Sequence, residues 1–111
     1  MKLLTKELRE KFPKFRETEE KNPEDIPVIA KFFAPWNSWT WYAIEGEPIL
    51  DEHRKEIDYH FFGYVRGFAN ELGYFSLKEM ESVKGAFGLG IERDLYFGEE
   101  HTLKEVIDTR L

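Results

Sequence analysis

The sequence predicts a single α+β domain in which a mainly antiparallel sheet of about five strands packs against an N-terminal helix and two short later helices. The chain has 111 residues, of which 41% are hydrophobic, and its 10 Phe, 5 Tyr and 3 Trp can fill one aromatic-rich core. Runs of β-branched and aromatic residues are separated by connections of hairpin length. Two capping-box patterns mark the starts of helices late in the chain. Together these features favour an antiparallel sheet with its helices on one face.

The first expected element is a helix near the N-terminus. Thr5 is a suitable N-cap, and the apolar residues that follow recur at steps of four and three. Pro13 disfavours helical geometry at Phe12, so the helix is expected to break there. The segment Asn22–Pro27 contains two prolines and is expected to form a loop.

Four strands are expected next along the chain, at residues 28–33, 39–44, 57–65 and 72–75. The strongest signal is the segment 39–44, whose odd-numbered residues should share one face of the sheet and whose even-numbered residues should share the other. Turns are expected between the strands, including one at residues 45–48, where Gly46 and Pro48 lie close together.

The last elements are two helices with a strand between them. Ser76 and Thr102 are each followed three residues later by Glu, a pattern that predicts helices over residues 77–84 and 103–110. Between these helices, residues 91–97 alternate between apolar and polar positions, which predicts a fifth strand.

Composition and charge exclude several classes of protein. The chain has no cysteine, which excludes disulfide scaffolds, cysteine-based metal sites and thiolate catalysis. Its 16 basic and 22 acidic side chains give a net charge of −6, which argues against direct binding to nucleic acid. No apolar run approaches the length of a membrane helix and no secretory signal is recognisable, so we expect a cytoplasmic protein without a membrane partner.

The tryptophan pair Trp39 and Trp41 is the first candidate binding site. Aromatic faces stack on ligands and indole N–H groups donate hydrogen bonds, so the pair could line a groove for a peptide, a sugar or a base. The alternative is that both indoles simply cover the inner face of the sheet.

Four carboxylates on or beside expected strands form the second candidate: Glu45, Asp58, Glu92 and Asp94. Glu92 and Asp94 are two residues apart and should therefore share one face, as a site for a hard cation or a paired acid and base would require. The alternative is that these acids are ordinary solvated groups on strands.

Arg93 is the third candidate because it lies on the apolar face of the expected strand 91–97. If that face is buried, the guanidinium needs a carboxylate partner, such as Asp58 or Glu45. A buried structural ion pair and a clamp for a substrate are both consistent with this pattern.

Other motifs carry little chemistry. The three histidines, His53, His60 and His101, lack the mutual spacing of metal ligands. The glycine-rich segment 85–90 has the wrong order for a dinucleotide fingerprint and lacks the Lys-Ser/Thr of a phosphate loop. We therefore expect no cofactor and no bound metal.

Several blocks of sequence, in order along nearly the whole chain, resemble one bacterial family. The blocks are Met1–Leu8, Lys31–Pro35, Asn37–Ala43, Glu45–Gly46, Phe61–Gly63, Glu71–Leu77 and Gly88–Leu95. The family they resemble is domain of unknown function 2958, whose genes are found on plasmids, conjugative elements and phages. The resemblance implies a mobile-element context and implies no activity or site residue.

These observations lead to three functional hypotheses. The first is a small non-enzymatic module, associated with mobile DNA, that binds another protein and could act in counter-defence by occupying the basic groove of a nuclease. The second is a metal- or nucleotide-binding, hydrolase-like enzyme that uses the strand carboxylates. The third, direct binding of nucleic acid through the basic N-terminal residues, is opposed by the acidic remainder of the chain. The oligomeric state is left open.

Overall fold

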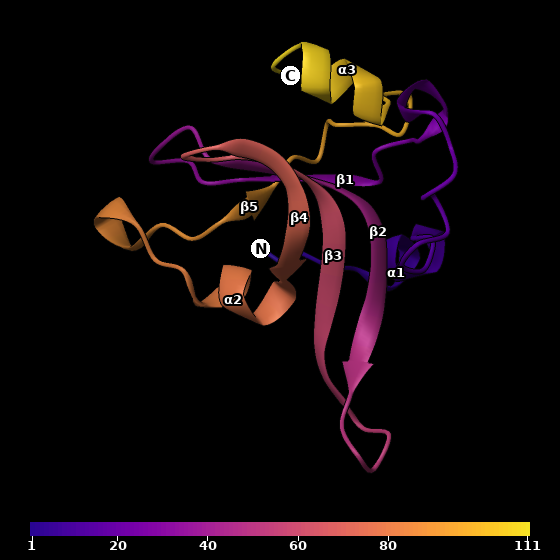
Figure 1. Cartoon of the computed structure of the whole chain (residues 1–111). Coiled ribbons are helices and arrows are strands. Elements are labelled where there is room, and N and C mark those ends of the chain that lie inside the picture. Colours follow the sequence, from indigo (N-terminus) through magenta and orange to yellow (C-terminus); the bar gives the residue numbers. More distant parts are fainter.

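The computed structural model describes all residues, 1–111, and has the predicted α+β architecture (Figure 1). Its five strands are β1 (Ala30–Phe33), β2 (Thr40–Leu50), β3 (Glu56–Arg66), β4 (Asn70–Ser76) and β5 (Glu92–Arg93). They form one sheet in the order β4-β3-β2-β1-β5, and every pair of neighbours is antiparallel. The three α-helices are α1 (Lys6–Lys11), α2 (Leu77–Ser82) and α3 (Leu103–Asp108), and two short 3₁₀ turns cover Pro23–Asp25 and Ala86–Gly88.

The three helices begin where the capping residues predict. The side-chain oxygens of Thr5, Ser76 and Thr102 each accept a hydrogen bond from the backbone N–H three residues later. Each helix is only six residues long, so it depends on these caps and on packing against the sheet. None of them has the length and apolar character needed to cross a membrane.

The two faces of the sheet are both covered, which corrects the expectation that the helices lie on one face. On the face that we call the α1 face, α1 and α2 help to enclose a core that includes Phe32, Phe61 and Met80. On the opposite α3 face, α3 covers Tyr42 and other buried residues. The strand 39–44 is therefore apolar on both sides because each side supplies a separate core.

β2 continues through residues 45–48, where the sequence predicts a turn, and that expectation is wrong. β1 pairs only with residues 40–43 of β2, so the outer half of β2 has one free side. Pro48 is tolerated on such an edge, where no N–H partner is required. The register with β3 shifts between Ala43 and Glu45, which identifies a bulge rather than a turn. Because of the bulge, Ile44 and Glu45 both line the α3 face.

β5 has two residues rather than the seven expected from the alternation of residues 91–97. Asp94 ends the strand because its carboxylate accepts a hydrogen bond from the backbone N–H of Tyr96, at 3.0 Å, and its carbonyl accepts one from Phe97. This local turn competes with the strand, so the chain changes direction after Arg93 and the alternating residues that follow do not form a strand.

Candidate functional site

The seven sequence-predicted site residues do not form one site. Trp39 and Trp41 lie at the end of the sheet near the β1–β2 turn, Glu45 lies on the α3 face, and Asp58 lies beside the start of α2. The remaining three belong to β5 and the turn that follows it, at the opposite edge of the sheet from β4. No group of three or more His, Asp or Glu side chains is placed to hold a metal ion.

Glu45 holds a loop against the sheet. Its side chain is buried and accepts hydrogen bonds from the backbone N–H groups of Arg16 and Thr18, both at 3.0 Å, and from the Thr18 hydroxyl. Arg16 has a left-handed backbone with φ of 73°, and this conformation lets neighbouring N–H groups converge on one carboxylate. The Glu45 carboxylate, which the sequence suggests as a ligand-binding group, is therefore bound by Arg16 and Thr18 of the same chain.

Asp58 connects β3 to the start of α2. Its carboxylate accepts hydrogen bonds from the Ser76 hydroxyl, from the backbone N–H of Lys78 at 3.1 Å and from His60 Nε2 at 2.9 Å. The Ser76 hydroxyl also accepts from the N–H of Glu79, so it is engaged on both sides. A serine, a histidine and an aspartate therefore lie together, but they serve to cap a helix.

Burial opposes ionisation of Asp58, yet the hydrogen bonds from Ser76, the backbone N–H groups of Lys78 and Tyr59, and His60 hold its pKa below the ordinary value. A carboxyl whose pKa is lowered by folding stabilises the fold when it is ionised. This contribution is complete above the pKa of the carboxyl in the unfolded chain, about 3.9, and is lost as the pH falls through the lower folded value.

We expect Asp58→Asn to lower the free energy of unfolding at pH 7 by about 1–3 kcal/mol, because hydrogen bonds to a charged acceptor are lost. The difference from the wild type should shrink below about pH 4, where the wild-type carboxyl begins to be protonated. Urea unfolding at several pH values measures both effects, with Glu20→Gln, an exposed carboxylate, as the control. A difference that stays constant to the lowest pH would contradict the assignment.

Arg93 finds carbonyl oxygens rather than the carboxylate that the sequence suggests. Its Nη1 donates to the backbone carbonyls of Lys2 and Leu3, at 3.0 and 2.8 Å, and so fastens the N-terminal segment to β5. Asp94 is paired with Lys31 at 3.4 Å. Glu92 pairs only through its backbone, opposite Phe33. These three residues stabilise an edge of the sheet and share no common ligand position.

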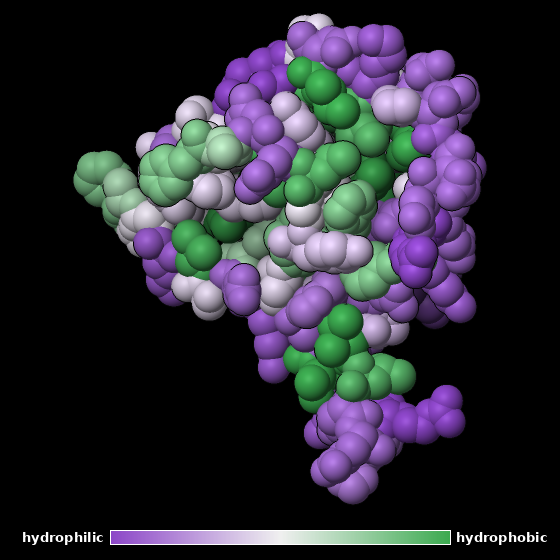
Figure 2. All heavy atoms as spheres, viewed as in Figure 1, coloured by the Kyte–Doolittle hydropathy of each residue, from purple (hydrophilic) through white to green (hydrophobic).

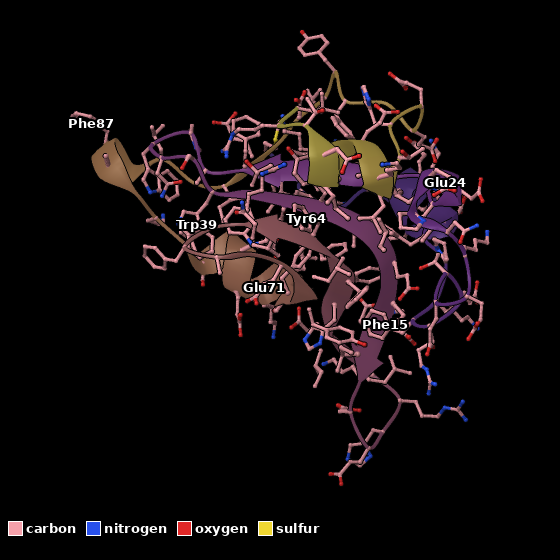
Figure 3. All side chains as sticks on the ribbon, turned by 45° about the horizontal axis from the view of Figure 1, so that its top comes forward. Phe15, Glu24, Trp39, Tyr64, Glu71 and Phe87 are labelled. Atoms are coloured by element: carbon pink, nitrogen blue, oxygen red, sulfur yellow. The ribbon has the colours of Figure 1, made fainter.

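Aromatic side chains from three loops and from the start of β2 gather at one end of the sheet. We call this surface the aromatic end and define it by five residues: Trp36, Trp39, Trp41, Phe68 and Phe87. The rings of Trp39 and Trp41 are 5.8 Å apart, and Phe68 meets Trp39 edge-on at 5.2 Å. Figure 3 shows Trp39 and Phe87 on the same side of the molecule.

Glycines allow these loops to meet. A Cβ at Gly67 would lie 2.4 Å from the Trp39 ring, and a Cβ at Gly85 would lie 2.1 Å from the Trp36 ring. The β3–β4 turn and the loop after α2 are thus both built against the β1–β2 turn. The indoles of Trp39 and Trp41 are half-buried in this arrangement, so they serve mainly as the base on which the more exposed rings lie.

Phe68 and Phe87 are the most exposed aromatic residues of the aromatic end, with 98% and 100% of their surface accessible. Phe87 also has a left-handed backbone with φ of 59°, a conformation that costs a non-glycine residue roughly 1–2 kcal/mol. The sequence patterns single out neither residue. The available signal was that each is flanked by Gly and Ala in a short turn, where no neighbouring side chain can cover a ring.

The loops of the aromatic end are free of acidic residues. Residues 34–39, 66–70 and 83–90 contain Arg66 and Lys84 and none of the 22 acidic residues of the chain. Arg110 adds a further cation nearby, because its guanidinium donates to the carbonyl of Ser38. The aromatic end is therefore apolar to weakly basic on a protein of net charge −6.

A cleft of about 510 Å³ opens on the α3 face. Figure 2 shows hydrophobic residues gathered on this face below α3. The apolar side chains that line the cleft are Ile26, Ile44, Phe62, Leu72, Tyr74 and Leu103. Its size is within the range of ligand pockets, but its polar side chains, such as Glu45 and Thr18, are bonded to each other.

The fold and these sites define a small antiparallel α+β domain that carries an exposed aromatic surface. The family described as Protein of unknown function (DUF2958) matches residues 3–110, and the chain belongs to that family. No curated protein and no solved structure matches the chain. The resemblance seen in the sequence is thereby confirmed as family membership.

Proposed function

We propose that this chain is a non-enzymatic protein-binding module whose docking surface is the aromatic end. The observation that carries the proposal is the pair Phe68 and Phe87, two wholly exposed phenylalanines on loops that both pack against the β1–β2 turn. Exposed aromatic groups that stand on a supported surface are typical of the residues that dominate protein interfaces. The strained backbone of Phe87 adds support, since a conformation that costs folding free energy often serves a function.

The polar candidates favour binding over catalysis. Glu45, Asp58 and Arg93 use their hydrogen-bonding groups on partners within the fold. Groups that are engaged in this way are poorly placed to exchange protons with a substrate. None of the contacts made by Glu45, Asp58 and Arg93 favours the alternative hypothesis of a hydrolase-like enzyme.

A role in counter-defence stays a prediction, and the proposed surface restricts the form that such a role can take. A protein that imitates a phosphate backbone presents acidic residues to its target. The aromatic end presents none. An inhibitor that docks through this surface would therefore bind its target by apolar contact and would block the access of nucleic acid to that target.

The proposal is tested by Phe68→Ala/Phe87→Ala, with Tyr96→Ala as the matched control, because Tyr96 is 96% exposed and lies outside the aromatic end. Both variants should unfold within about 0.5 kcal/mol of the wild type, since the replaced rings are exposed. The immobilised wild-type chain and the control should retain the same proteins from a bacterial lysate, and the double variant should lose at least one of them. Equal recovery by all three, or no recovery above the empty support, would overturn the proposal.

A further inference from the structure

The sheet has one unprotected edge. Edge strands present unpaired N–H and C=O groups that can pair with another strand, and proteins usually block them with short length, bulges, proline or lysine. Three segments of this sheet have a free side: β5, the outer half of β2, and β4.

The first two segments are protected. β5 is only two residues long, and the backbone N–H of Arg93 is taken by the sulfur of Met1. The outer half of β2 begins at a bulge and contains Pro48, and the N–H of Gly46 donates to the carbonyl of Pro13 at 3.0 Å. Neither segment offers an extended row of free backbone groups.

β4 has none of these protections. It runs for seven residues and pairs with β3 without a register shift, from Asn70 opposite Arg66 to Ser76 opposite His60. It contains no proline and no lysine, and Glu71 is its only charged residue. Two of its large side chains, Leu72 and Tyr74, are 48% and 63% exposed.

We infer that β4 pairs with β4 of a second copy of this chain, antiparallel and about a two-fold axis through Gly73. The strand is self-complementary in this register, because Leu72 of one copy lies opposite Tyr74 of the other and forms two apolar cross-strand pairs. Glu71 then lies opposite Phe75 rather than opposite a second Glu71. Gly73 lies on the axis opposite its own copy, and the space around the position of its Cβ is open.

The cleft on the α3 face also favours a second copy of the chain as the partner of β4. Leu72 and Tyr74 belong to its apolar lining, so the cleft lies beside the free edge of β4. In the paired register, Tyr74 of the second copy lies next to Leu72, where it extends the apolar lining. The dimer thus covers apolar surface on the α3 face that the monomer leaves open.

Charge predicts how this association responds to salt. Two chains of net charge −6 repel each other, while the paired strands carry one acid each and contribute mainly apolar contacts. Added salt screens the repulsion and strengthens apolar association. The dimer should therefore become more stable at high ionic strength, unlike a complex with nucleic acid, which weakens.

The test is sedimentation equilibrium of the whole chain over a series of concentrations, at about 0.15 M and about 1 M NaCl. We expect the mass to rise from 13.3 kDa towards twice that value, at lower concentration in high salt. Leu72→Lys/Tyr74→Lys should raise the dissociation constant at least tenfold, because it places lysines on the edge. Tyr96→Lys places a lysine at an exposed aromatic residue away from β4 and should leave the constant unchanged.

A wild-type chain that stays at 13.3 kDa at every concentration and salt would overturn the inference and would leave β4 open to a strand from another protein. Dimerisation that is lost in Phe68→Ala/Phe87→Ala but kept in Leu72→Lys/Tyr74→Lys would also overturn it. This design separates the inference from the proposed function, because the two surfaces are changed in different variants.

Discussion

Gly63→Ala is expected to destabilise the domain by more than about 3 kcal/mol, because there is no space for a methyl group at this point. A Cβ at Gly63 would lie 1.8 Å from the carbonyl oxygen of Tyr42 and 2.8 Å from its carbonyl carbon. Both are backbone atoms of the central strand, so relief requires that β2 and β3 move apart where β2 bulges. The close approach of the two backbones is what requires glycine here.

Gly73→Ala is the matched control for this prediction. Gly73 is the direct cross-strand neighbour of Gly63, yet a Cβ there would meet nothing within 4 Å. This change should be neutral or stabilising by about 0.5 kcal/mol, because alanine restricts the unfolded chain more than glycine does. Thermal unfolding should separate the two variants by more than about 12 °C, and similar melting temperatures would contradict the model of the β2–β3 contact.

Local signals in the sequence predict local structure well. The hydroxyl groups of Thr5, Ser76 and Thr102 determine where the helices begin, and these interactions span only three residues. The alternation at residues 39–44 correctly separates Trp41 from Tyr42, which belong to the cores on opposite faces. In these cases the information lies within one turn or one strand.

The remaining errors come from partners that are distant in sequence. The turn expected at Gly46 and Pro48 does not form because β3 pairs with this part of β2, and Pro48 is tolerated there because β1 is too short to reach it. The sequence predicts the helices on one face because nothing near the central strands indicates that α3, from the far end of the chain, covers Tyr42. Such contacts depend on the whole fold.

The candidate sites show the same contrast between local signals and contacts that are distant in sequence. The pattern of residues draws attention to Trp39, but Phe68 joins the same surface only when the β3–β4 turn is placed against it. Acidic residues such as Glu45 resemble ligands in a sequence because their partners there are backbone N–H groups, which every residue has. Residue type alone therefore cannot distinguish a binding carboxylate from a structural one.

Glu45→Ala is expected to lower the free energy of unfolding by about 3–5 kcal/mol, because it leaves buried N–H groups without an acceptor. Glu45 accepts three hydrogen bonds from Arg16 and Thr18 and is only 3% exposed. Glu45→Gln should cost less, about 1–3 kcal/mol, since one oxygen acceptor remains and the new NH₂ group faces N–H donors. Chemical denaturation measures both values.

The neighbouring Glu47 provides the control that makes this prediction specific. It also accepts a backbone N–H from the same loop, that of Phe15 at 3.1 Å, but it is less buried and makes only this one bond. Glu47→Ala should therefore cost about 1 kcal/mol. Hydrogen exchange should report faster opening of the amides of Arg16 and Thr18 in Glu45→Gln and unchanged protection there in Glu47→Ala. If the two alanine variants were equally stable, the carboxylate of Glu45 could not be what holds residues 15–18 to the sheet, because its three bonds would count for no more than one.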